Sequence, residues 1–251
     1  MPNQQIIETT GLTLSNLKWK FLDVFYPPFC CACGRIGYEI CPDCLAKIIL
    51  TSDLTLCRIC ADQIDQPGVC AECLKKKPSF SQLCSLGIYT GVLKQAIQHL
   101  KFNRGLGIIN SLLDPVVNFI HSWEIHPELI SPVPLSIRRY RERGYNQSEL
   151  IAKPIAEYLK ISYSSACIKR IRDTHSQVGL NAEERKNNIV NAFEADKETC
   201  GGRVILLIDD IATTGATLNE CAAALKKAGA ADVLCFTLAR AVESVNMSEK
   251  R

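Results

Sequence analysis

Eight cysteines in four C-x-x-C pairs constrain the N-terminal part of this chain more than any other feature of its sequence. The pairs are Cys30 and Cys33, Cys41 and Cys44, Cys57 and Cys60, and Cys70 and Cys73. A C-x-x-C turn places two sulfur atoms on one side of a tight loop, and two such turns complete the four-sulfur shell of a structural zinc ion. The spacing predicts two structural zinc sites, one from the first two pairs and one from the last two, and it also allows interleaved pairing.

The residues around these pairs favour metal ligation over a hydrophobic core, and the expected reducing compartment disfavours disulfides. Gly34, Pro42, Asp62 and Gly68 flank the pairs, whereas core cysteines have apolar neighbours. A catalytic zinc site keeps an open position and normally uses histidine, and no histidine precedes Cys84. Six cysteines remain outside the pairs, and we assign them no redox role: Cys31, Cys84, Cys167, Cys200, Cys221 and Cys235.

The overall composition is that of a globular chain. Its 251 residues suit one large domain or two small ones, and 47% hydrophobic residues can form a packed core. The 14 glycines and 11 prolines are scattered, which excludes a collagen-like or a long disordered chain. The most apolar run, 204–208, lies between Arg203 and Asp209, so we expect no membrane span. The first residues lack the regions of a secretory signal, so we expect a cytoplasmic protein.

The chain divides into a small metal-binding part and a larger α/β part. Apolar residues in 12–25 recur at helical spacing and predict an amphipathic helix that packs on the next domain; its polar face has too few basic residues to favour a membrane surface. We expect this helix within 1–28, a double zinc ribbon in 29–78, an α/β domain in 79–243 and a tail in 244–251.

Strands and helices alternate through the larger domain, which predicts a parallel sheet covered by helices on both faces. The expected strands cover residues 86–89, 129–133, 163–168, 204–208 and 232–238, with a strand or loop at 192–194. The expected helices cover residues 93–101, 106–121, 147–159 and 216–228, and a polar loop passes through residue 188. Cys221 lies on the apolar side of the last helix, so we expect it to pack in the core.

The segment RVILLIDDIATTGATL, residues 203–218, combines an apolar strand, two adjacent carboxylates, a turn of small residues and a helix. Ligands of open α/β sheets bind outside the carboxyl ends of strands, where Asp209 and Asp210 are expected and can accept hydrogen bonds from vicinal hydroxyl groups. Small residues then let backbone N–H groups surround a phosphate at the helix N-terminus. The residues of this predicted anion-binding loop are Ala212, Thr213, Thr214, Gly215, Ala216 and Thr217.

Other interpretations of this segment fit less well. It lacks the lysine of a Walker A loop and does not match G-x-G-x-x-G, which disfavours nucleoside triphosphate hydrolysis and dinucleotide binding. An ordinary strand, turn and helix with an aspartate cap is the alternative. Two adjacent acids followed by T-T-G-x-T favour a ligand site.

This segment resembles the ribose-5-phosphate motif of the type I phosphoribosyltransferases. The paired cysteines, SLGIYTGVLKQAIQHLKF, PVPLSIRRYRERGYNQSELIA, RDTHSQVGLNAEERKNNIVNAF and IDDIATTGATL occur in an order that resembles the ComF family of competence proteins, from about residue 17 onward. The resemblance implies a double zinc ribbon joined to a type I phosphoribosyltransferase fold. It also implies a link to DNA uptake and natural transformation.

The resemblance assigns roles to individual residues. It implies that Asp209 and Asp210 hold the ribose hydroxyls and that Thr213, Thr214, Gly215 and Thr217 bind the 5-phosphate. It places the pyrophosphate loop at Val133, Pro134 and Leu135, followed by Arg141, Arg143, Asn146 and Gln147, and a mobile catalytic flap at Thr174, Gln177 and Arg185. Arginine forks suit a diphosphate, although a solvated basic face is the alternative for this region.

The implied ligands are phosphoribosyl pyrophosphate and Mg²⁺. The implied reaction is displacement of pyrophosphate from the anomeric carbon by a nitrogen nucleophile, in which catalysis depends on positioning and electrostatics. Purine-salvage enzymes for 6-oxopurines resemble this loop but carry a third aspartate where this chain has Thr213, so the acceptor base is not identified.

Two other functional classes stay open at the level of sequence. The chain could be a binding module that holds single-stranded DNA or a competence helicase, using its zinc ribbons and the basic clusters at 138–143 and 169–172. It could also be a regulator that senses phosphoribosyl pyrophosphate. The net charge of +3 does not indicate nucleic-acid binding by itself, and the Asp209–Asp210 pair would repel a phosphate backbone, which favours the enzyme.

Overall fold

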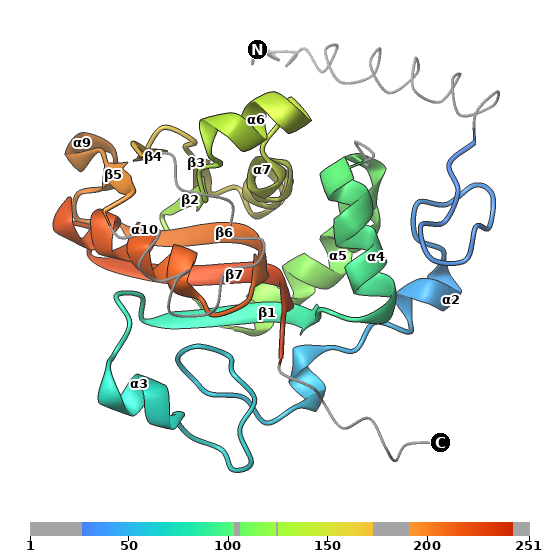
Figure 1. The fold of residues 1–251 in the computed structure, drawn as a ribbon, viewed down its shortest axis with the longest axis horizontal. Coiled ribbons are helices and arrows are strands. Elements are labelled where there is room, and N and C mark those ends of the chain that lie inside the picture. The colour runs from blue at the N-terminus through green and yellow to red at the C-terminus, as the bar shows by residue number, and fades with distance from the viewer. Residues whose placement is uncertain (1–26, 103–105, 124, 173–190, 243–251) are drawn as a thin grey trace, which may run out of the picture.

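A computed structural model describes residues 27–102, 106–123, 125–172 and 191–242. Its centre is a five-stranded sheet in the order β1–β7–β6–β2–β3, in which every neighbouring pair is parallel (Figure 1). The strands are β1 (Gln82–Ile88), β2 (Leu129–Pro132), β3 (Ser162–Tyr163), β6 (Val204–Ala212) and β7 (Asp232–Arg240). The predicted α/β class with a parallel sheet is confirmed.

Helices cover both faces of this sheet. One face packs against α4 (Gly91–Phe102), α5 (Leu106–Ser122) and α7 (Gln147–Leu159), and the other packs against α10 (Ala216–Lys227). Successive strand residues point to opposite faces, so Leu206 and Ile208 contact the first group of helices while Ile205 and Leu207 contact α10. Because both faces are buried, β6 has a continuous apolar run instead of an alternating one.

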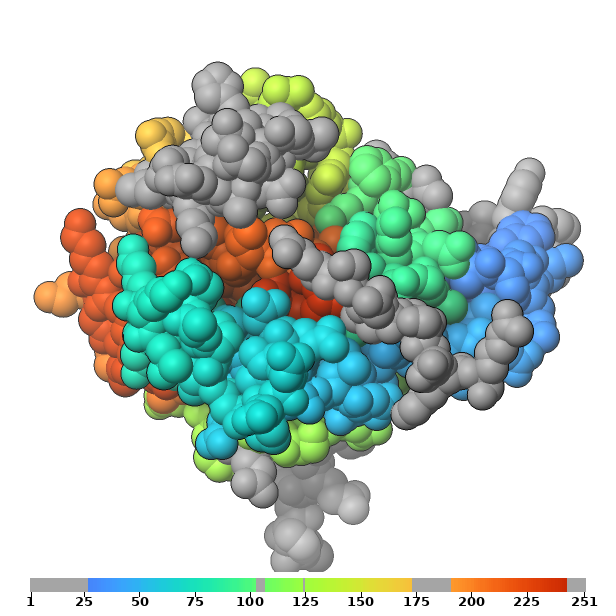
Figure 2. Space-filling model, turned by 60° about the horizontal axis from the view of Figure 1, so that its bottom comes forward, coloured from blue at the N-terminus to red at the C-terminus, as the bar shows by residue number. Residues whose placement is uncertain are grey.

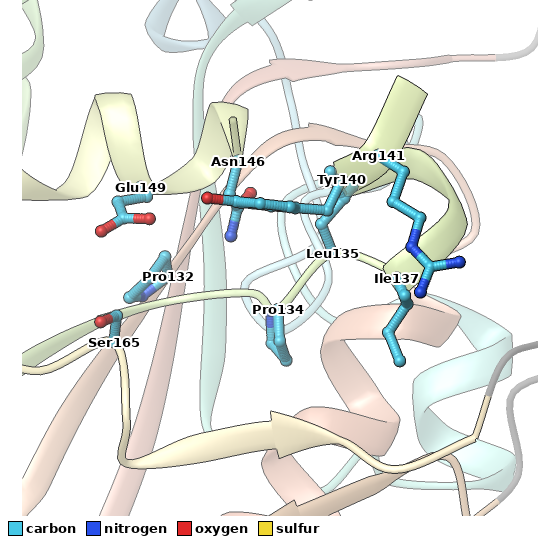
Figure 3. Close-up of a pocket in the computed structure, with 9 residues that line it drawn as sticks. All are labelled: Pro132, Pro134, Leu135, Ile137, Tyr140, Arg141, Asn146, Glu149 and Ser165. Atoms are coloured by element: carbon cyan, nitrogen blue, oxygen red, sulfur yellow. The ribbon is translucent and has the colours of Figure 1, made fainter. Parts of the chain in front are cut away.

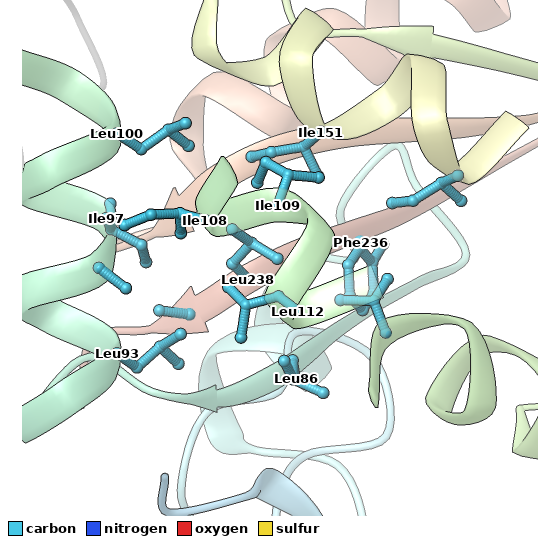
Figure 4. Packing of buried hydrophobic residues seen from close by; sticks show 14 of the residues in the cluster. Leu86, Leu93, Ile97, Leu100, Ile108, Ile109, Leu112, Ile151, Phe236 and Leu238 are labelled. Atoms are coloured by element: carbon cyan, nitrogen blue, oxygen red, sulfur yellow. The ribbon is translucent and has the colours of Figure 1, made fainter. Parts of the chain in front are cut away.

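The larger apolar cluster lies between the sheet and helices α4, α5 and α7. In Figure 4, Leu93 and Ile97 of α4 and Leu112 of α5 point toward Phe236 and Leu238 of β7. All five side chains are fully buried. This layer fixes α4 against the sheet, and the C-terminal end of α4 contributes to the site described below.

The helices match their predicted ranges closely, whereas three strands are longer than expected. The first strand begins at Gln82 instead of residue 86, because buried Ser85 is accommodated by a 2.7 Å hydrogen bond to Thr237 of β7. β6 continues past residue 208 to Ala212, and β7 continues to Arg240, since the two strands pair with each other over this whole length. Asp209 and Asp210 therefore lie inside a strand and not after its end, which corrects the expectation for these two residues.

The expected strand at 163–168 was wrong. The chain turns after β3, and residues 168–170 instead form β4 (Ile168–Arg170), which pairs antiparallel with β5 (Phe193–Ala195) in a separate two-stranded sheet. Ser164 and Ser165 occupy the turn, where the Ser164 hydroxyl accepts a hydrogen bond from the Ala166 amide at 3.3 Å. A short helix, α9 (Lys197–Cys200), then leads into β6.

The cysteine-rich segment contains only short elements within the described residues: α2 (Pro42–Leu45), a 3-10 turn η1 (Thr51–Asp53) and α3 (Ala71–Lys75). Its connecting stretch follows the outer edge of β1, where the Ile88 amide donates to the Ile49 carbonyl at 2.9 Å and Leu50 bridges Gly87 in antiparallel fashion. The Thr51 hydroxyl donates to the Ser85 carbonyl. The small domain is therefore hydrogen-bonded to one edge of the sheet.

The predicted N-terminal amphipathic helix lies outside the described residues. Among the helices that are described, none combines the length and the apolar character that a membrane span requires.

Candidate functional site

Asp209 and Asp210 lie where β6 extends beyond its neighbour β2. The last pair between these strands joins Pro132 to Ile208, and the Val133 amide then donates to the Ile208 carbonyl at 2.8 Å. Beyond this point β2 turns away, so one side of β6 is open at both acids. The sequence correctly placed the acids at the carboxyl end of the sheet, although they belong to the strand itself.

The N-terminus of α7 holds the Asp209 carboxylate. Its Oδ1 atom accepts hydrogen bonds from the Ser148 hydroxyl at 2.8 Å and from the Asp210 amide at 2.9 Å. Burial, followed by the charge of Asp210, raises the pKa of the Asp209 carboxyl from 3.8 to about 7. The two adjacent acids therefore create a site that favours a cation or a set of hydroxyl donors, because either would relieve their repulsion.

Asp210 already has a cationic partner. Its Oδ2 atom lies 2.7 Å from Nζ of Lys101, the penultimate residue of α4, and both side chains are largely buried. The next residue, Phe102, lies under the Arg143 guanidinium at 5.7 Å from ring centroid to carbon. Burial, followed by the charge of Arg139, lowers the pKa of Arg143, whereas Asp210 acts in the opposite direction. Arg143 therefore lies over the residue next to Lys101, near enough to Asp210 for the two charges to interact.

The turn between β6 and α10 consists of small residues and leads directly into the N-terminus of a helix. Thr213 and Thr214 are exposed, and the Thr214 hydroxyl accepts from the Ala216 amide at 3.3 Å. Gly215, at the start of α10, has φ 71°, a left-handed conformation that a side chain disfavours. Ala216 and Thr217 begin α10, where the first N–H groups of a helix have no acceptor within the helix itself.

The loop after β2 forms one wall of a separate cavity of about 310 Å³. Its lining residues are Pro132, Pro134, Leu135, Ile137, Tyr140, Arg141, Asn146, Glu149 and Ser165. Figure 3 shows that Tyr140 extends across this space, with Glu149 and Ser165 on one side of it and Arg141 on the other. Arg141 thus borders this cavity, while Arg143 contacts Phe102 on the side of the acid pair. The structure separates two arginines that the sequence had grouped together.

Helix α6 (Ile137–Arg143) carries these arginines, and Asn146 fixes the loop behind it. The Asn146 amide donates to the Val133 carbonyl at 3.0 Å, and its oxygen caps α7 by accepting from the Ser148 amide at 3.1 Å. Asn146 thus joins the loop after β2 to the N-terminus of α7. Gln147 is buried as well. The predicted flap residues Thr174, Gln177 and Arg185 lie outside the described residues.

Sequence reasoning missed two residues of the site, Lys101 and Ser148. Each touches one of the two acids. The one available signal for Lys101 was its position at the end of an amphipathic helix that faces the sheet. Ser148 stands two residues after Asn146, so the sequence identifies it as part of a helix N-terminus. Its hydrogen bond to Asp209, 61 residues later, has no signal in the sequence.

The eight paired cysteines form two compact clusters. The first cluster contains Cys30, Cys33, Cys41 and Cys44, and the second contains Cys57, Cys60, Cys70 and Cys73; within each, the Sγ atoms lie within 4.8 Å of one another. The sequential pairing is therefore the one observed. Cys33 and Cys41 Sγ atoms, and likewise those of Cys60 and Cys70, are 3.6 Å apart, close to the separation of about 3.8 Å that tetrahedral zinc with Zn–S bonds of about 2.3 Å requires.

Backbone groups in both clusters stabilise thiolates. The Cys41 amide donates to Cys30 Sγ at 3.3 Å, and the Cys70 amide donates to Cys57 Sγ at the same distance. Burial alone would raise the pKa of Cys30 and Cys57, but such backbone donors lower these values to about 6 and about 7. Burial has the opposite result at Cys44 and Cys60, where it raises the pKa to about 12. The fit to a four-sulfur zinc site therefore rests on the clustering of the sulfur atoms. Cys221 is fully buried in the core, as predicted.

Comparisons with known proteins agree with this architecture. The model of the phosphoribosyl transferase domain matches residues 146–250, and the model of the double zinc ribbon domain matches residues 21–74. Competence protein F of Haemophilus influenzae is 35% identical over 180 residues, which cover 68% of this chain and 78% of that protein. The chain belongs to the ComF family. Its two domain types are those that the sequence had predicted.

Other ComF relatives extend the match over more of the chain. The DNA utilization protein YhgH of Salmonella typhimurium is 34% identical over 209 residues, which cover 81% of this chain and 91% of that protein. Competence protein ComFC of Bacillus subtilis is 27% identical over 219 residues, which cover 80% of this chain and 84% of that protein. The similarity to ComF proteins therefore includes both the zinc ribbon and the sheet domain.

Proposed function

We propose that this ComF protein binds phosphoribosyl pyrophosphate with Mg²⁺ at the carboxyl end of β6 and transfers the phosphoribosyl group to a nitrogen acceptor. The observation that supports this most strongly is the open side of β6, where Asp209 and Asp210 stand directly before the Gly215 turn and the N-terminus of α10. A ribose that carries a 5-phosphate presents hydroxyls and an anion, which are the groups that the acids and the helix N-terminus can bind. The match to the phosphoribosyl transferase domain supports the same ligand.

In this proposal each part of the site has a separate role. Asp209 and Asp210 accept hydrogen bonds from the ribose hydroxyls, and the backbone N–H groups around Gly215 and Thr217 bind the 5-phosphate. Arg143 neutralises the leaving diphosphate, because its guanidinium lies over Phe102, the neighbour of the Lys101 that contacts Asp210. No covalent nucleophile is needed, since a fixed ribose and phosphate hold the reacting carbon in place.

The acid pair also suits Mg²⁺. Asp210 already holds the ammonium group of Lys101, so a cation is accommodated at this carboxylate. When bound with the substrate, Mg²⁺ supplies positive charge that neutralises the diphosphate. We propose that Lys101 leaves Asp210 when the ligand binds.

We further propose that two zinc ions occupy the cysteine clusters and have a structural role. Each cluster supplies four sulfur ligands and leaves no position for substrate. Metal analysis of the purified protein should give two zinc ions per chain. A protein that contained no zinc and kept its fold in chelator would contradict this role.

Calorimetric titration with phosphoribosyl pyrophosphate and Mg²⁺ tests the ligand site. The double variant Asp209→Asn/Asp210→Asn should bind at least about tenfold more weakly, because it loses two charged hydrogen-bond acceptors, and Thr217→Val should weaken binding as well. Asp114→Asn, on the exposed surface of α5, removes the same type of charge away from the site and serves as the control. Unchanged affinity in both site variants would overturn the assignment, and ³¹P detection of pyrophosphate release with candidate bases tests the transfer.

We propose a cellular role in the use of external DNA, on the basis of the names of the relatives. Loss of the protein should impair transformation after DNA has reached the cytoplasmic membrane. The double variant in a deletion strain separates catalysis from scaffolding. Failure of rescue at normal protein level and zinc content supports a working phosphoribosyl pocket, whereas full rescue rejects it.

A second candidate, a binding component for single-stranded DNA or a competence helicase, is favoured by one observation. Helix α6 has no buried residue; it exposes Ile137 before Arg138, and Tyr140 between Arg139 and Arg141. Aromatic and basic side chains in alternation bind single strands by stacking and charge. Tyr140→Ala should weaken salt-sensitive DNA binding under this function, and unchanged DNA binding would reject it.

A further inference from the structure

A buried arginine at the end of β7 connects the two domains. Arg240 is only 5% exposed although it carries a charge, and its guanidinium reaches three acceptors. Nε donates to the Ala61 carbonyl at 3.2 Å, Nη1 donates to the Ala212 carbonyl at 3.1 Å, and Nη2 pairs with Asp62 Oδ1 at 3.3 Å. Arginine is the side chain that can serve three acceptors in different directions from one rigid plane.

One of these acceptors begins the candidate phosphate-binding turn. Ala212 is the last residue of β6, and Thr213 to Gly215 follow it directly. Its carbonyl accepts from both Arg240 Nη1 and the Ala241 amide, the latter at 2.9 Å. Two donors on one carbonyl fix the orientation of the peptide from which the turn departs.

The other two acceptors belong to the second cysteine cluster. Ala61 and Asp62 immediately follow Cys60 and complete the C-x-x-C turn of Cys57 and Cys60, which we call the second knuckle; the turn of Cys30 and Cys33 is the first. The Ala61 amide donates to the Cys57 carbonyl at 3.0 Å, and the Cys57 amide donates to the Asp62 carbonyl at 2.7 Å. The shape of this knuckle therefore decides where the Ala61 carbonyl and the Asp62 carboxylate point. In Figure 2 this part of the small domain, in cyan to teal, lies directly against the orange and red segments of the sheet domain.

The two knuckles differ in the residue that follows their second cysteine. In the first, Gly34 follows Cys33, has φ 75° and donates to the Cys30 carbonyl at 2.8 Å. Ala61 holds the same position in the second knuckle at φ 54°, although a side chain disfavours this conformation. Its methyl group is buried in the core cluster that also contains Leu83 and Leu218. The second knuckle thus keeps an unfavourable backbone conformation at the point where it meets the sheet domain.

We infer that Arg240 is a positioning residue that couples the second cysteine cluster to the turn at 213–215. With the knuckle formed, Ala61 and Asp62 hold the guanidinium so that Nη1 fixes the Ala212 carbonyl. If the knuckle loses its shape, the guanidinium loses two of its three acceptors and the turn loses one of the two donors at its origin. The turn's role as a phosphate site rests on the proposed function, but the coupling itself does not.

The first cluster provides an internal comparison. Cys30, Cys41 and Cys44 pack with the apolar cluster of α4 and α5, on the other face of the sheet from α10. None of the described hydrogen bonds joins the first knuckle to Ala212 or to residues 213–215. Disturbing the first cluster should therefore leave the turn unchanged.

Hydrogen exchange of the full-length zinc-loaded protein tests the coupling. Asp62→Ala removes a half-exposed side chain and keeps the cysteines, so the variant should fold and retain its zinc. The hydrogen-exchange rates of amides 213–217 should increase at least about threefold. Amides 204–208 of the same strand should keep wild-type rates. Arg240→Met should produce the same local change. Unaltered rates at 213–217 in Asp62→Ala would overturn the inference even if Arg240→Met failed to fold.

A double-mutant cycle separates coupling from simple destabilisation. Cys57→Ser should speed exchange at 213–217 in the wild-type background and add little in the Arg240→Met background, whereas Cys41→Ser should have no effect on the turn in either. Equal effects of Cys41→Ser and Cys57→Ser would refute the coupling. Binding of phosphoribosyl pyrophosphate to the same variants is measured in parallel. If the wild-type protein does not bind, the proposed function fails while the exchange data still decide on the coupling.

Discussion

Replacing Asp209 by asparagine should stabilise the protein, and the gain should increase with pH. Burial and the neighbouring charge of Asp210 raise the pKa of Asp209 from 3.8 to about 7. The unfolded chain therefore ionises this carboxyl at a lower pH than the folded chain does, and wild-type stability falls as pH rises from about 4 to about 7. Asparagine keeps the oxygen that accepts from Ser148 and from the Asp210 amide, but it has no charge to bury.

The size of the effect follows from the pKa. One pKa unit corresponds to about 1.4 kcal/mol, so the advantage of Asp209→Asn should grow by about 1–2 kcal/mol between about pH 5.5 and about pH 8.5 and stay level at higher pH. For a chain of this size that is a difference in Tm of about 2–8 °C. The same variant should bind phosphoribosyl pyrophosphate more weakly, as expected where a binding site retains unfavourable charge for its ligand.

Thermal unfolding of both proteins at matched pH, in Mg²⁺-free buffer, measures this gain. Comparing the variant with the wild-type chain at each pH cancels the effect of pH on the cysteine clusters. Asp210→Asn is the contrasting variant: it removes the partner of the largely buried Lys101, and it should lower the Tm. A loss of stability in Asp209→Asn, or a gain that is independent of pH, would refute the argument that the buried, charged Asp209 carboxylate destabilises the folded protein.

Three further predictions concern other parts of the molecule. Leu112→Ala should lower the free energy of unfolding in urea by about 3 kcal/mol, because Leu112 is fully buried between α5 and the sheet; a loss below about 1 kcal/mol would contradict this packing. Gly215→Ala should cost about 1 kcal/mol at φ 71° and weaken phosphoribosyl pyrophosphate binding in calorimetry, with zinc content unchanged. Lys101→Met should lower the Tm by leaving Asp210 without its cation, and a Tm equal to that of the wild-type chain would show that the ion pair contributes nothing.

Features encoded by local spacing could be predicted from the sequence. The two cysteine clusters have the predicted membership because a C-x-x-C turn determines its own geometry. The helices α4, α7 and α10 end within a residue or two of their predicted limits, since amphipathic periodicity reports burial directly. The position of the acids at the open end of the sheet also followed from the order of strand, acids, turn and helix.

Features that depend on distant partners could not be predicted. Ser85 looks unlike a core strand residue until its hydrogen bond to Thr237, 152 residues later, is known. Lys101 could be recognised as a helix-end lysine, but its pairing with Asp210 depends on how α4 packs on the sheet. Arg240 has no local signature at all, because its three acceptors come from two domains.

The contact between the small domain and the edge of β1 limits how this protein can be divided. β1 is an outer strand of the sheet, and the Ile49 carbonyl, the Leu50 bridge and the Thr51 hydroxyl occupy its free side. A truncated chain that begins at residue 79 would present this strand with unpaired N–H and C=O groups, which is the usual starting point for edge-to-edge aggregation. The zinc ribbon therefore covers an edge of the sheet, and the phosphoribosyl transferase domain of this protein cannot be separated from it without exposing that edge.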